Sequence, residues 1–489
     1  MLKLDHEPVR LSGDDDDRAP AVVAVPVASA DRADAAPGLR AAGFTGAIGE
    51  AMALAGDGDG ALRLAFGIGA RGDADALRLG ALEVGRRAPE GELLAFDLTG
   101  LPGDEQAAGA AAVVEGAILG SYRWSAPEPG GAEPSGPALR VDVGDAQGDE
   151  ALRVACRRAA VRARAANWAR RLADTPPTDL TPAALARVAG ELAAAHGWED
   201  ASLGGDALLD AGLGAIHGVG RGSANPPQLI DVTYRGRGDG PVDVVLVGKG
   251  VTMDCGGLNL KTNRPMAAVM KSDMAGGAAV LAALASAATL ELPLNVRVLV
   301  PSVENLVGPG ALLPGDVVQH PDGRRTEVSN TDAEGRLLLA DSLAYAAKAG
   351  DGAALIDVGT LSEAPFAPVG WTTISRHPWL SQGLAGAART TGEVAVQIPM
   401  VDGYDEWIAS TVADSKNFTY AHMSQDLMVV GTFLEPFAAG RAWAHVDVVG
   451  VAWVNYPWKT WPAGATGAPT RTLVELLAAW DDVAAEAGR

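Results

Sequence analysis

Two carboxylates and one guanidinium alternate along residues 330–336, which read NTDAEGR. In an extended segment, side chains two residues apart lie on the same face, so Asp332, Glu334 and Arg336 would project together. Crowded carboxylates raise each other's pKa unless cations neutralise them, and one arginine does not balance two acids. The pattern favours a metal site, although a solvated, charged edge strand explains this segment equally well when it is considered alone.

A second group of polar side chains follows the apolar run at residues 242–247. It consists of Lys249, Asp254 and Lys261, in a glycine-containing segment whose backbone can approach a ligand closely. This segment is not a phosphate-binding P-loop, because Lys249 is followed by glycine and not by Ser or Thr. A third piece places Asp273 just before an apolar helical pattern, where the simplest interpretation is a helix cap.

The three pieces together supply enough charged groups for a two-metal site. Carboxylate oxygens suit divalent ions such as Mn²⁺, Mg²⁺ or Zn²⁺, and four carboxylates balance two such ions if one lysine is neutral and coordinates metal. Two ions about 3.5–4 Å apart can hold a bridging water and make it a nucleophile near neutral pH. A protonated lysine could polarise a carbonyl as the oxyanion forms. The candidate residues are Lys249, Asp254, Lys261, Asp273, Asp332, Glu334 and Arg336.

Alternating strand-like and helical patterns place these side chains at strand-to-helix junctions of an α/β protein. We expect a smaller N-terminal α/β domain at residues 1–148, a linker helix at 149–175 and a larger catalytic α/β domain at 176–489. The catalytic domain would contain a central mixed sheet flanked by helices. Strand-like runs lie at 21–29, 61–66, 92–98, 117–124, 228–234, 242–247, 295–301, 353–358 and 442–451, and helical runs at 149–173, 276–288, 334–348 and 472–486.

The composition indicates a globular protein: 48% of the 489 residues are hydrophobic and 20% are charged. The net charge of −22 makes a nucleic-acid partner unexpected, because such proteins carry basic surface. No apolar run is long enough to predict a membrane span, and the N-terminus has no secretory signal pattern. Two cysteines, Cys156 and Cys255, make no disulfide framework. We therefore expect a cytoplasmic location.

The motifs resemble those of the leucyl aminopeptidases, also called cytosol aminopeptidases. The resemblance rests on VGKG at 247–250, DCGG at 254–257 with Lys261, Asp273 before Met274, and NTDAEGR at 330–336, which is matched in full. It spans about residues 170–480. It implies an aminopeptidase that uses two divalent metal ions to hydrolyse the N-terminal, Leu- or Met-like residue from peptides with a free N-terminus. The ions would be Zn²⁺ or Mn²⁺, with Co²⁺ or Mg²⁺ as alternatives, and the assembly would be a homohexamer.

The resemblance also implies a role for each candidate residue. Lys249, Asp254, Asp273 and Glu334 would hold the more exchangeable metal, and Asp254, Asp332 and Glu334 would hold the other. Lys261 would polarise the scissile carbonyl, and Arg336 would hold a bicarbonate that acts as the general base. The implied substrate-binding residues are Lys261, Asp273, Asn305, Thr360 and Leu361.

Four departures from the family pattern leave the substrate open. Cys255 replaces the usual serine, one extra residue stands between Lys261 and Asp273, the turn at 362–365 differs, and residues 415–437 lack the usual glycine-rich stretch. One alternative is a dedicated enzyme that removes the N-terminal Met of a precursor peptide, as in a bottromycin-like pathway. Another is a binding or regulatory protein whose catalysis is dispensable, and a third is a degenerate hydrolase with altered metal affinity.

Several other patterns have simpler explanations than chemistry. The glycines at 67–72 follow a strand and mimic a dinucleotide fingerprint, but the acid that should follow is at best Asp97, so a tight turn is the better interpretation. His445 lies in an apolar run and is expected to be a core histidine with its polar atoms satisfied. Trp453, Trp458 and Trp461 are expected to serve in packing.

Overall fold

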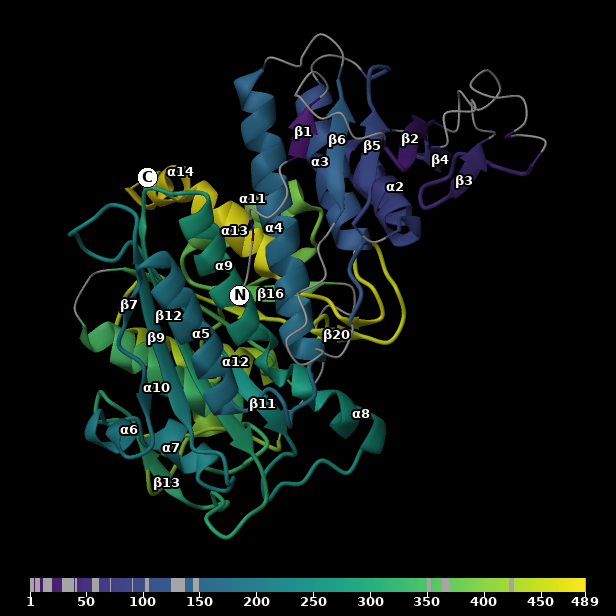
Figure 1. Ribbon diagram of the computed structural model, residues 1–489. Helices are drawn as coiled ribbons and strands as arrows, with labels where there is room; N and C mark the ends of the chain where they lie inside the picture. Colours follow the sequence, from purple (N-terminus) through teal and green to yellow (C-terminus); the bar gives the residue numbers. More distant parts are fainter. Residues whose placement is uncertain are drawn as a thin grey trace. The chain divides into compact units, whose positions relative to one another are not determined.

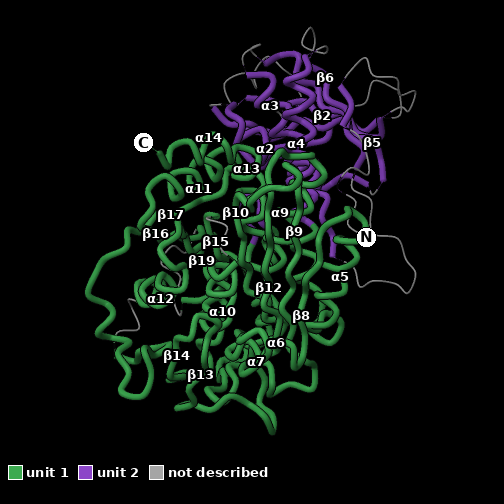
Figure 2. Tube along the Cα trace, turned by 90° about the vertical axis from the view of Figure 1, so that its left-hand side faces the viewer, with its two compact units in different colours: residues 1–2, 168–456, 462–489 green, residues 3–167, 457–461 purple. Residues whose placement is uncertain are grey.

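The chain folds into two compact units, which Figure 2 shows in different colours. Unit 1 contains residues 1–2, 168–456 and 462–489, and unit 2 contains residues 3–167 and 457–461. The border falls within helix α4 (Glu150–Asp174), where the sequence predicts a long helix. The computed structural model describes residues 4, 9–11, 20–28, 39, 42–54, 61–70, 72–89, 91–101, 105–124, 137–143, 149–349, 353–362, 370–421 and 426–488. Most of the turn at 362–365 lies outside these residues.

Unit 2 is built on a six-stranded sheet in the order β1-β6-β5-β2-β4-β3. Every neighbouring pair is parallel except β3 with β4. The strands are β1 (Val9–Leu11), β2 (Val22–Val27), β3 (Ala51–Leu54), β4 (Leu62–Gly67), β5 (Leu93–Asp97) and β6 (Ala138–Asp142), and the helices are α2 (Ala74–Arg87) and α3 (Gln106–Gly120).

The strand expected at 117–124 is wrong, because residues up to Gly120 belong to helix α3. Nearly every α3 residue from Gly109 onward is buried, so the helix is apolar all round and its end has the composition of a buried strand. The tight turn after β4 is present: the amides of Ile68, Gly69 and Gly72 donate to backbone carbonyls. Gly69 and Gly72 adopt φ of +67° and +62°, which glycine tolerates.

Unit 1 contains a ten-stranded mixed sheet whose main path runs β17-β16-β19-β15-β10-β12-β9-β7. Its middle strands β19, β15, β10 and β12, labelled in Figure 2, are mutually parallel. Strand β11 extends the parallel set by pairing with β12, and Figure 1 labels both strands. The strands are β7 (Glu199–Asp200), β8 (Leu203–Gly204), β9 (Gln228–Arg235), β10 (Val244–Gly248), β11 (Gly250–Asp254), β12 (Asn295–Asn305), β15 (Ala354–Gly359), β16 (Trp371–Ser375), β17 (Ala395–Pro399) and β19 (Trp443–Asp447). The predicted mixed sheet is therefore confirmed.

Helices cover both faces of this sheet. On one face, Val245 and Val247 of β10 join the hydrophobic core that also holds helices α7, α10 and α12. On the other face, a Cβ at Gly248 would meet Val280 of α9, which packs beside α13. The helices are α5 (Pro182–His196), α7 (Gly214–Gly220), α9 (Ala275–Thr289), α10 (Glu334–Lys348), α11 (Pro378–Thr391), α12 (Asp426–Leu434), α13 (Thr470–Ala478) and α14 (Trp480–Ala485).

One helical stretch, residues 264–289, is long and apolar enough by length and composition to cross a membrane. From the sequence, we predicted no such stretch. It comprises α8 (Arg264–Val269), the 3₁₀ helix η3 (Met270–Met274) and α9. Because 72% of its apolar window is buried inside the protein, it is better explained as a core helix.

Candidate metal centre

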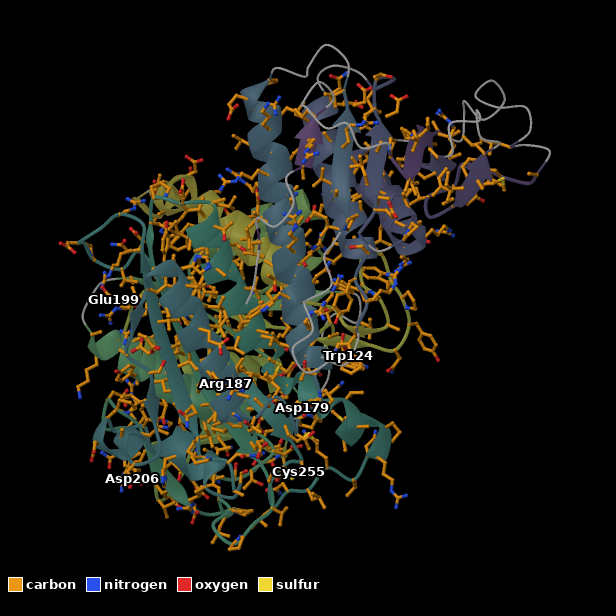
Figure 3. All side chains as sticks on the ribbon, in the orientation of Figure 1. Trp124, Asp179, Arg187, Glu199, Asp206 and Cys255 are labelled. Carbon is orange, nitrogen blue, oxygen red and sulfur yellow. The ribbon has the colours of Figure 1, made fainter. Side chains whose placement is uncertain are left out.

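The carboxyl ends of four neighbouring strands bring the candidate residues together. Lys249 follows β10, Asp254 ends β11, Asn305 ends β12 and Thr360 follows β15. These strands are parallel, so their carboxyl ends meet at one edge of the sheet, which is where open α/β sheets bind ligands. Cys255, directly after Asp254, is labelled in Figure 3 and marks this part of unit 1.

Lys249 lies at the centre of one half of the cluster and is only 3% exposed. Its Nζ lies 2.8 Å from Oδ2 of Asp273 and 2.7 Å from Oε1 of Glu334. It also donates a hydrogen bond of 2.9 Å to the Thr360 carbonyl. The Thr360 hydroxyl donates to Asp273 Oδ1, so Thr360 holds both members of the ion pair.

Lys261 joins the other half of the cluster. Its Nζ lies 2.8 Å from Oδ2 of Asp254 and 2.6 Å from Oδ1 of Asp332. The other Asp254 oxygen accepts hydrogen bonds of 2.8 Å from the Gly256 amide and from Nδ2 of Asn305. Asn305 Nδ2 also donates to the Thr331 carbonyl at 3.0 Å, so it ties β12 to the loop that carries Asp332.

The loop at 330–336 is not an extended strand, so our alternation argument for Asp332, Glu334 and Arg336 is wrong. Helix α10 begins at Glu334, and Asp332 lies in the preceding turn, where its amide donates to Asn330 Oδ1 at 2.8 Å. A turn followed by a helix brings the two carboxylates together just as an extended segment would. The helix predicted over 334–348 is confirmed.

Asp273 is not the cap of the following helix, as its simplest interpretation suggested. It lies in η3, and the first residue before α9 is Met274, which makes no side-chain capping bond. The Asp273 side chain is buried and points to Lys249 and Thr360 instead. Its carboxylate therefore serves the cluster and not the helix end.

Gly335 leaves the space through which Lys249 reaches the cluster. A Cβ at Gly335 would lie 2.6 Å from Lys249 Cε, 2.7 Å from its Nζ and 2.6 Å from Leu361 Cδ2. Contacts this short require something to move, and the Nζ atom is held by two carboxylates. The glycine between Glu334 and Arg336 is thus required by the position of the lysine.

The cluster carries more negative charge than its lysines neutralise, because four buried or half-buried carboxylates face Lys249 and Lys261. Burial raises the pKa of Asp332 to about 6, and the charge of Asp254 adds to the shift. Burial and Asp254 raise the pKa of Glu334 well above its usual range. Burial also raises the pKa of Asp273, against the opposing charge of Lys249. The raised pKa values mean that too little positive charge surrounds these carboxylates to stabilise their ionised forms.

The donor set fits divalent cations. Oxygens of Asp254, Asp332 and Glu334 all lie within 4.8 Å of one another. Three buried oxygens contact a lysine ammonium and accept no other hydrogen bond from the described residues: Asp273 Oδ2, Asp332 Oδ1 and Glu334 Oε1. Buried carboxylate oxygens with spare lone pairs are the ligands that hard divalent ions prefer.

Arg336 pairs with a different acid, which the sequence analysis missed. Its Nη2 lies 2.9 Å from Oδ1 and 3.1 Å from Oδ2 of Asp426, the first residue of α12. Arg336 also donates to the carbonyls of Asn417 and Leu361, at 3.0 and 3.3 Å, and its guanidinium lies over the Phe418 ring. One feature of the sequence could have indicated this partner: Asp426 is an acid just before an apolar run, within residues 415–437, which lack the usual glycine-rich stretch.

The bicarbonate expected at Arg336 does not fit this arrangement. Arg336 is 1% exposed and Asp426 is 4% exposed, so the guanidinium already holds a buried anion supplied by the chain. A bicarbonate there would place a second negative charge directly beside the Asp426 carboxylate, which already contacts Nη2 of the guanidinium with both of its oxygens. Burying another anion without a further cation is costly.

The remaining expectations concern residues around the cluster. His445 is fully buried; burial disfavours its charged form, but the charge of Asp357 outweighs burial and raises its pKa to about 9. It is a core histidine, as the sequence suggested, but only half satisfied: Nδ1 pairs with Asp357, whereas Nε2 accepts or donates no hydrogen bond among the described residues and lies 3.8 Å from Asp447 Oδ2. Leu361 offers its carbonyl to Arg336 and its side chain packs near Gly335, whereas Asn305 and Thr360 bond to the candidate metal ligands themselves.

Comparison with known families shows which family the chain belongs to. The model of the cytosol aminopeptidase family, catalytic domain, matches residues 167–474, which include every residue of the cluster. The chain is 38% identical over 429 residues to a probable cytosol aminopeptidase of Roseiflexus castenholzii, with 85% of this chain and 87% of the relative covered. It is 39% identical over 425 residues to one of Mycobacterium ulcerans, with 84% and 79% covered.

Solved structures show the same relationship over nearly the whole chain. The bottromycin maturation enzyme BotP matches with a TM-score of 0.85 and 34% identity, covering 95% of this chain and 100% of that one. The same enzyme in complex with Mn matches with a TM-score of 0.84 and 35% identity, with 94% and 100% covered. A cytosol aminopeptidase from Coxiella burnetii matches with a TM-score of 0.79 and 28% identity, with 95% and 98% covered.

Proposed function

Because the chain belongs to the cytosol aminopeptidase family and is a metal-dependent aminopeptidase, we propose that the cluster at residues 249–334 is its catalytic metal centre. One observation carries this assignment: the buried carboxylates outnumber the lysines, and three of their oxygens accept no hydrogen bond from the described residues beyond their contact with a lysine ammonium. In this proposal Lys249, Asp254, Asp273 and Glu334 hold one divalent ion, and Asp254, Asp332 and Glu334 hold the other.

Two divalent ions held there would supply the charge that makes a water molecule nucleophilic near neutral pH. The chain has to release protons to bind them. Lys249 binds a cation only as the neutral amine, and the charges of Asp273 and Glu334, which outweigh its burial, now hold its pKa above the usual range. Once cations neutralise those carboxylates, burial and the cationic charge favour the neutral amine.

Lys261 is the residue that we assign to the substrate carbonyl. Its ammonium contacts Asp254 and Asp332 at the edge of the cluster, and it is less buried than Lys249. Burial works against its charge, but the acids around it hold its pKa above the usual range, so it stays protonated and can stabilise the developing oxyanion. Asp273 and the Leu361 backbone would receive the free N-terminal amine of the peptide. Asn305 and Thr360, whose bonds go to Asp254 and Asp273, are positioning residues in this proposal.

The metal identity, assembly and location are proposed from the relatives of this chain. A structure of BotP in complex with Mn supports Mn²⁺, and Zn²⁺ is the alternative. A homohexamer is proposed from the resemblance to this family. A cytoplasmic location is proposed because the relatives are named cytosol aminopeptidases. Measuring the mass in solution tests the hexamer.

A dedicated precursor-peptide aminopeptidase is a second candidate function. The match to a bottromycin maturation enzyme over 95% of this chain supports it, as do the departures at Cys255 and at residues 415–437. A substrate panel of Met-, Leu- and Ala-anilides and Met-initiated peptides distinguishes this function from general aminopeptidase activity. Strong preference for one peptide sequence beyond its first residue would favour the dedicated enzyme.

The test of the metal centre is hydrolysis of these anilides by purified protein loaded with Mn²⁺, Co²⁺ or Zn²⁺. We expect turnover with at least one metal and none after chelation. Absence of turnover with every metal and substrate would overturn the proposal in favour of a binding or regulatory role.

A further inference from the structure

Arg336 and Asp426 form a buried anion seat beside the metal centre. Both carboxylate oxygens of Asp426 contact Nη2 of Arg336, at 2.9 and 3.1 Å. The same nitrogen donates to the Leu361 carbonyl, and the residue before it, Thr360, offers its own carbonyl to Lys249. The carbonyls of two adjacent residues, Leu361 and Thr360, therefore connect Arg336 to Lys249, a candidate metal ligand.

Three separate segments keep this pair in place. Arg336 lies in the first turn of α10, and Asp426 begins α12, where the helix dipole favours a negative charge. The Asn417 carbonyl accepts from Nη1 of Arg336, and the Phe418 ring lies 5.5 Å from the guanidinium carbon. A side chain placed so firmly is preorganised, as a catalytic carboxylate has to be.

We propose that Asp426 supplies from the chain the basic anion that related aminopeptidases are expected to take from solution as bicarbonate. Both anions present two oxygens on one carbon to the guanidinium, so the carboxylate fills the same seat. The proposal rests on the metal centre being catalytic. It makes Asp426 the proton acceptor for the attacking water and makes the activity independent of bicarbonate.

The proton balance of this step closes without another reactant. The water gives one proton to the Asp426 carboxylate while its oxygen bonds to the scissile carbonyl carbon. The Asp426 carboxylic acid then gives that proton to the leaving nitrogen as the C–N bond breaks. The carboxylate is restored, and one water has been added across the peptide bond.

The competing explanation is that Asp426 only holds Arg336 in position. Two variants separate the explanations. Asp426→Gly removes the carboxylate and leaves space on Arg336 for a small anion, whereas Asp426→Asn fills the seat with a side chain that accepts no proton. A positioning role predicts that Asn, which still reaches Arg336, keeps most of the activity.

The experiment measures anilide hydrolysis by the full-length, metal-loaded protein in buffer freed of carbon dioxide, with and without added bicarbonate. We expect bicarbonate to leave the wild-type rate unchanged. Both variants should lose about 10²-fold or more in kcat with little change in KM, the magnitude typical of a lost general base. Bicarbonate should restore activity to Asp426→Gly and not to Asp426→Asn.

A binding measurement tests the seat without relying on activity. Calorimetric titration of bicarbonate should show binding to Asp426→Gly and none to the wild-type protein. If Asp426→Gly fails to fold, the activity of Asp426→Asn and the titration of the wild-type protein with bicarbonate still test the proposal. Stimulation of the wild type by bicarbonate, or full activity in Asp426→Asn, would overturn the proposal. A wild type without turnover under any metal would instead overturn the metal centre, and the titration would still test the seat.

Discussion

Each unit of the molecule buries a cluster of charged side chains, and the two clusters differ in charge balance. In unit 2, Glu115 is fully buried and contacts two arginines: Arg78 Nε lies 2.8 Å from one oxygen, and Arg162 Nε lies 3.0 Å from the other. In unit 1, four carboxylates face only two lysines. Asp75 also pairs with Arg78, so acid and base balance in the first cluster, whereas acid outnumbers base in the second.

The difference separates a structural ion cluster from a metal site. Both Glu115 oxygens accept charge-assisted hydrogen bonds from arginine, so their lone pairs are used. Asp273, Asp332 and Glu334 each keep a buried oxygen that contacts a lysine ammonium and accepts no other hydrogen bond from the described residues, and burial raises the pKa of each carboxyl. Burial of charge alone therefore does not identify a metal centre, whereas burial with a deficit of positive charge does.

The largest expected effect comes from Glu334→Ala. Removing a carboxylate that we assign to both metals should lower kcat/KM by about 10³-fold or more, because bound metal contributes several kcal/mol to the transition state. Metal titration should show weaker binding. The thermal unfolding midpoint of the metal-free protein should stay within a few degrees of wild type or rise, since the variant removes one of several repelling charges. Full activity would refute the assigned ligand.

Glu115→Ala should have the opposite effect. It leaves Arg78 and Arg162 buried without their shared carboxylate, so unit 2 should lose about 3–5 kcal/mol in free energy of unfolding, measured in urea. Metal content and activity per folded molecule should match wild type. A loss of metal with no loss of stability would contradict the comparison.

His445 extends the comparison to a third buried charge, between Asp357 and Asp447. Burial disfavours the charged form of His445, but the charge of Asp357 outweighs burial and raises its pKa in the fold to about 9, above the ordinary 6.5 of histidine. The charge therefore stabilises the folded state fully below about pH 6.5. That contribution, of order 3 kcal/mol, should fall as pH rises through about 9. The stability difference between wild type and His445→Asn, followed from pH 6 to 10, should narrow. A constant difference would argue against a charged His445.

Gly335→Ala should produce the smallest effect, through displacement of Lys249 from its two carboxylates. We expect metal affinity to fall about 10–100-fold, the range typical of residues that position metal ligands. Gly386→Ala is a matched control, because it also lies within a helix of unit 1 and its Cβ would meet only the Arg389 side chain, at 3.7 Å. Equal metal affinity in the two variants would contradict the role of Gly335.

The parts of the fold that the sequence predicts well are those with strong local patterns. Five elements lie close to their expected positions: the strands β9, β10, β12 and β15 and the helix α10. Burial against a sheet or helix produces runs or periodic patterns of apolar residues that can be recognised in the sequence. The strand expected at 117–124 failed because a helix buried all round has no polar face to reveal its period. The extended arrangement assumed for Asp332 and Glu334 failed because two carboxylates meet equally well across a turn.

The sequence by itself determined the chemistry proposed for this protein: residues 330–336 together with Lys249, Asp254, Lys261 and Asp273 indicate a divalent-metal site, and their resemblance to the cytosol aminopeptidases implies the reaction. Residue types limit which ligands are possible, and that information is local. Only the tertiary structure decided what Arg336 binds. Its partner Asp426 lies 90 residues away, and a pairing between distant segments is set by how α10 and α12 pack, which no local pattern records.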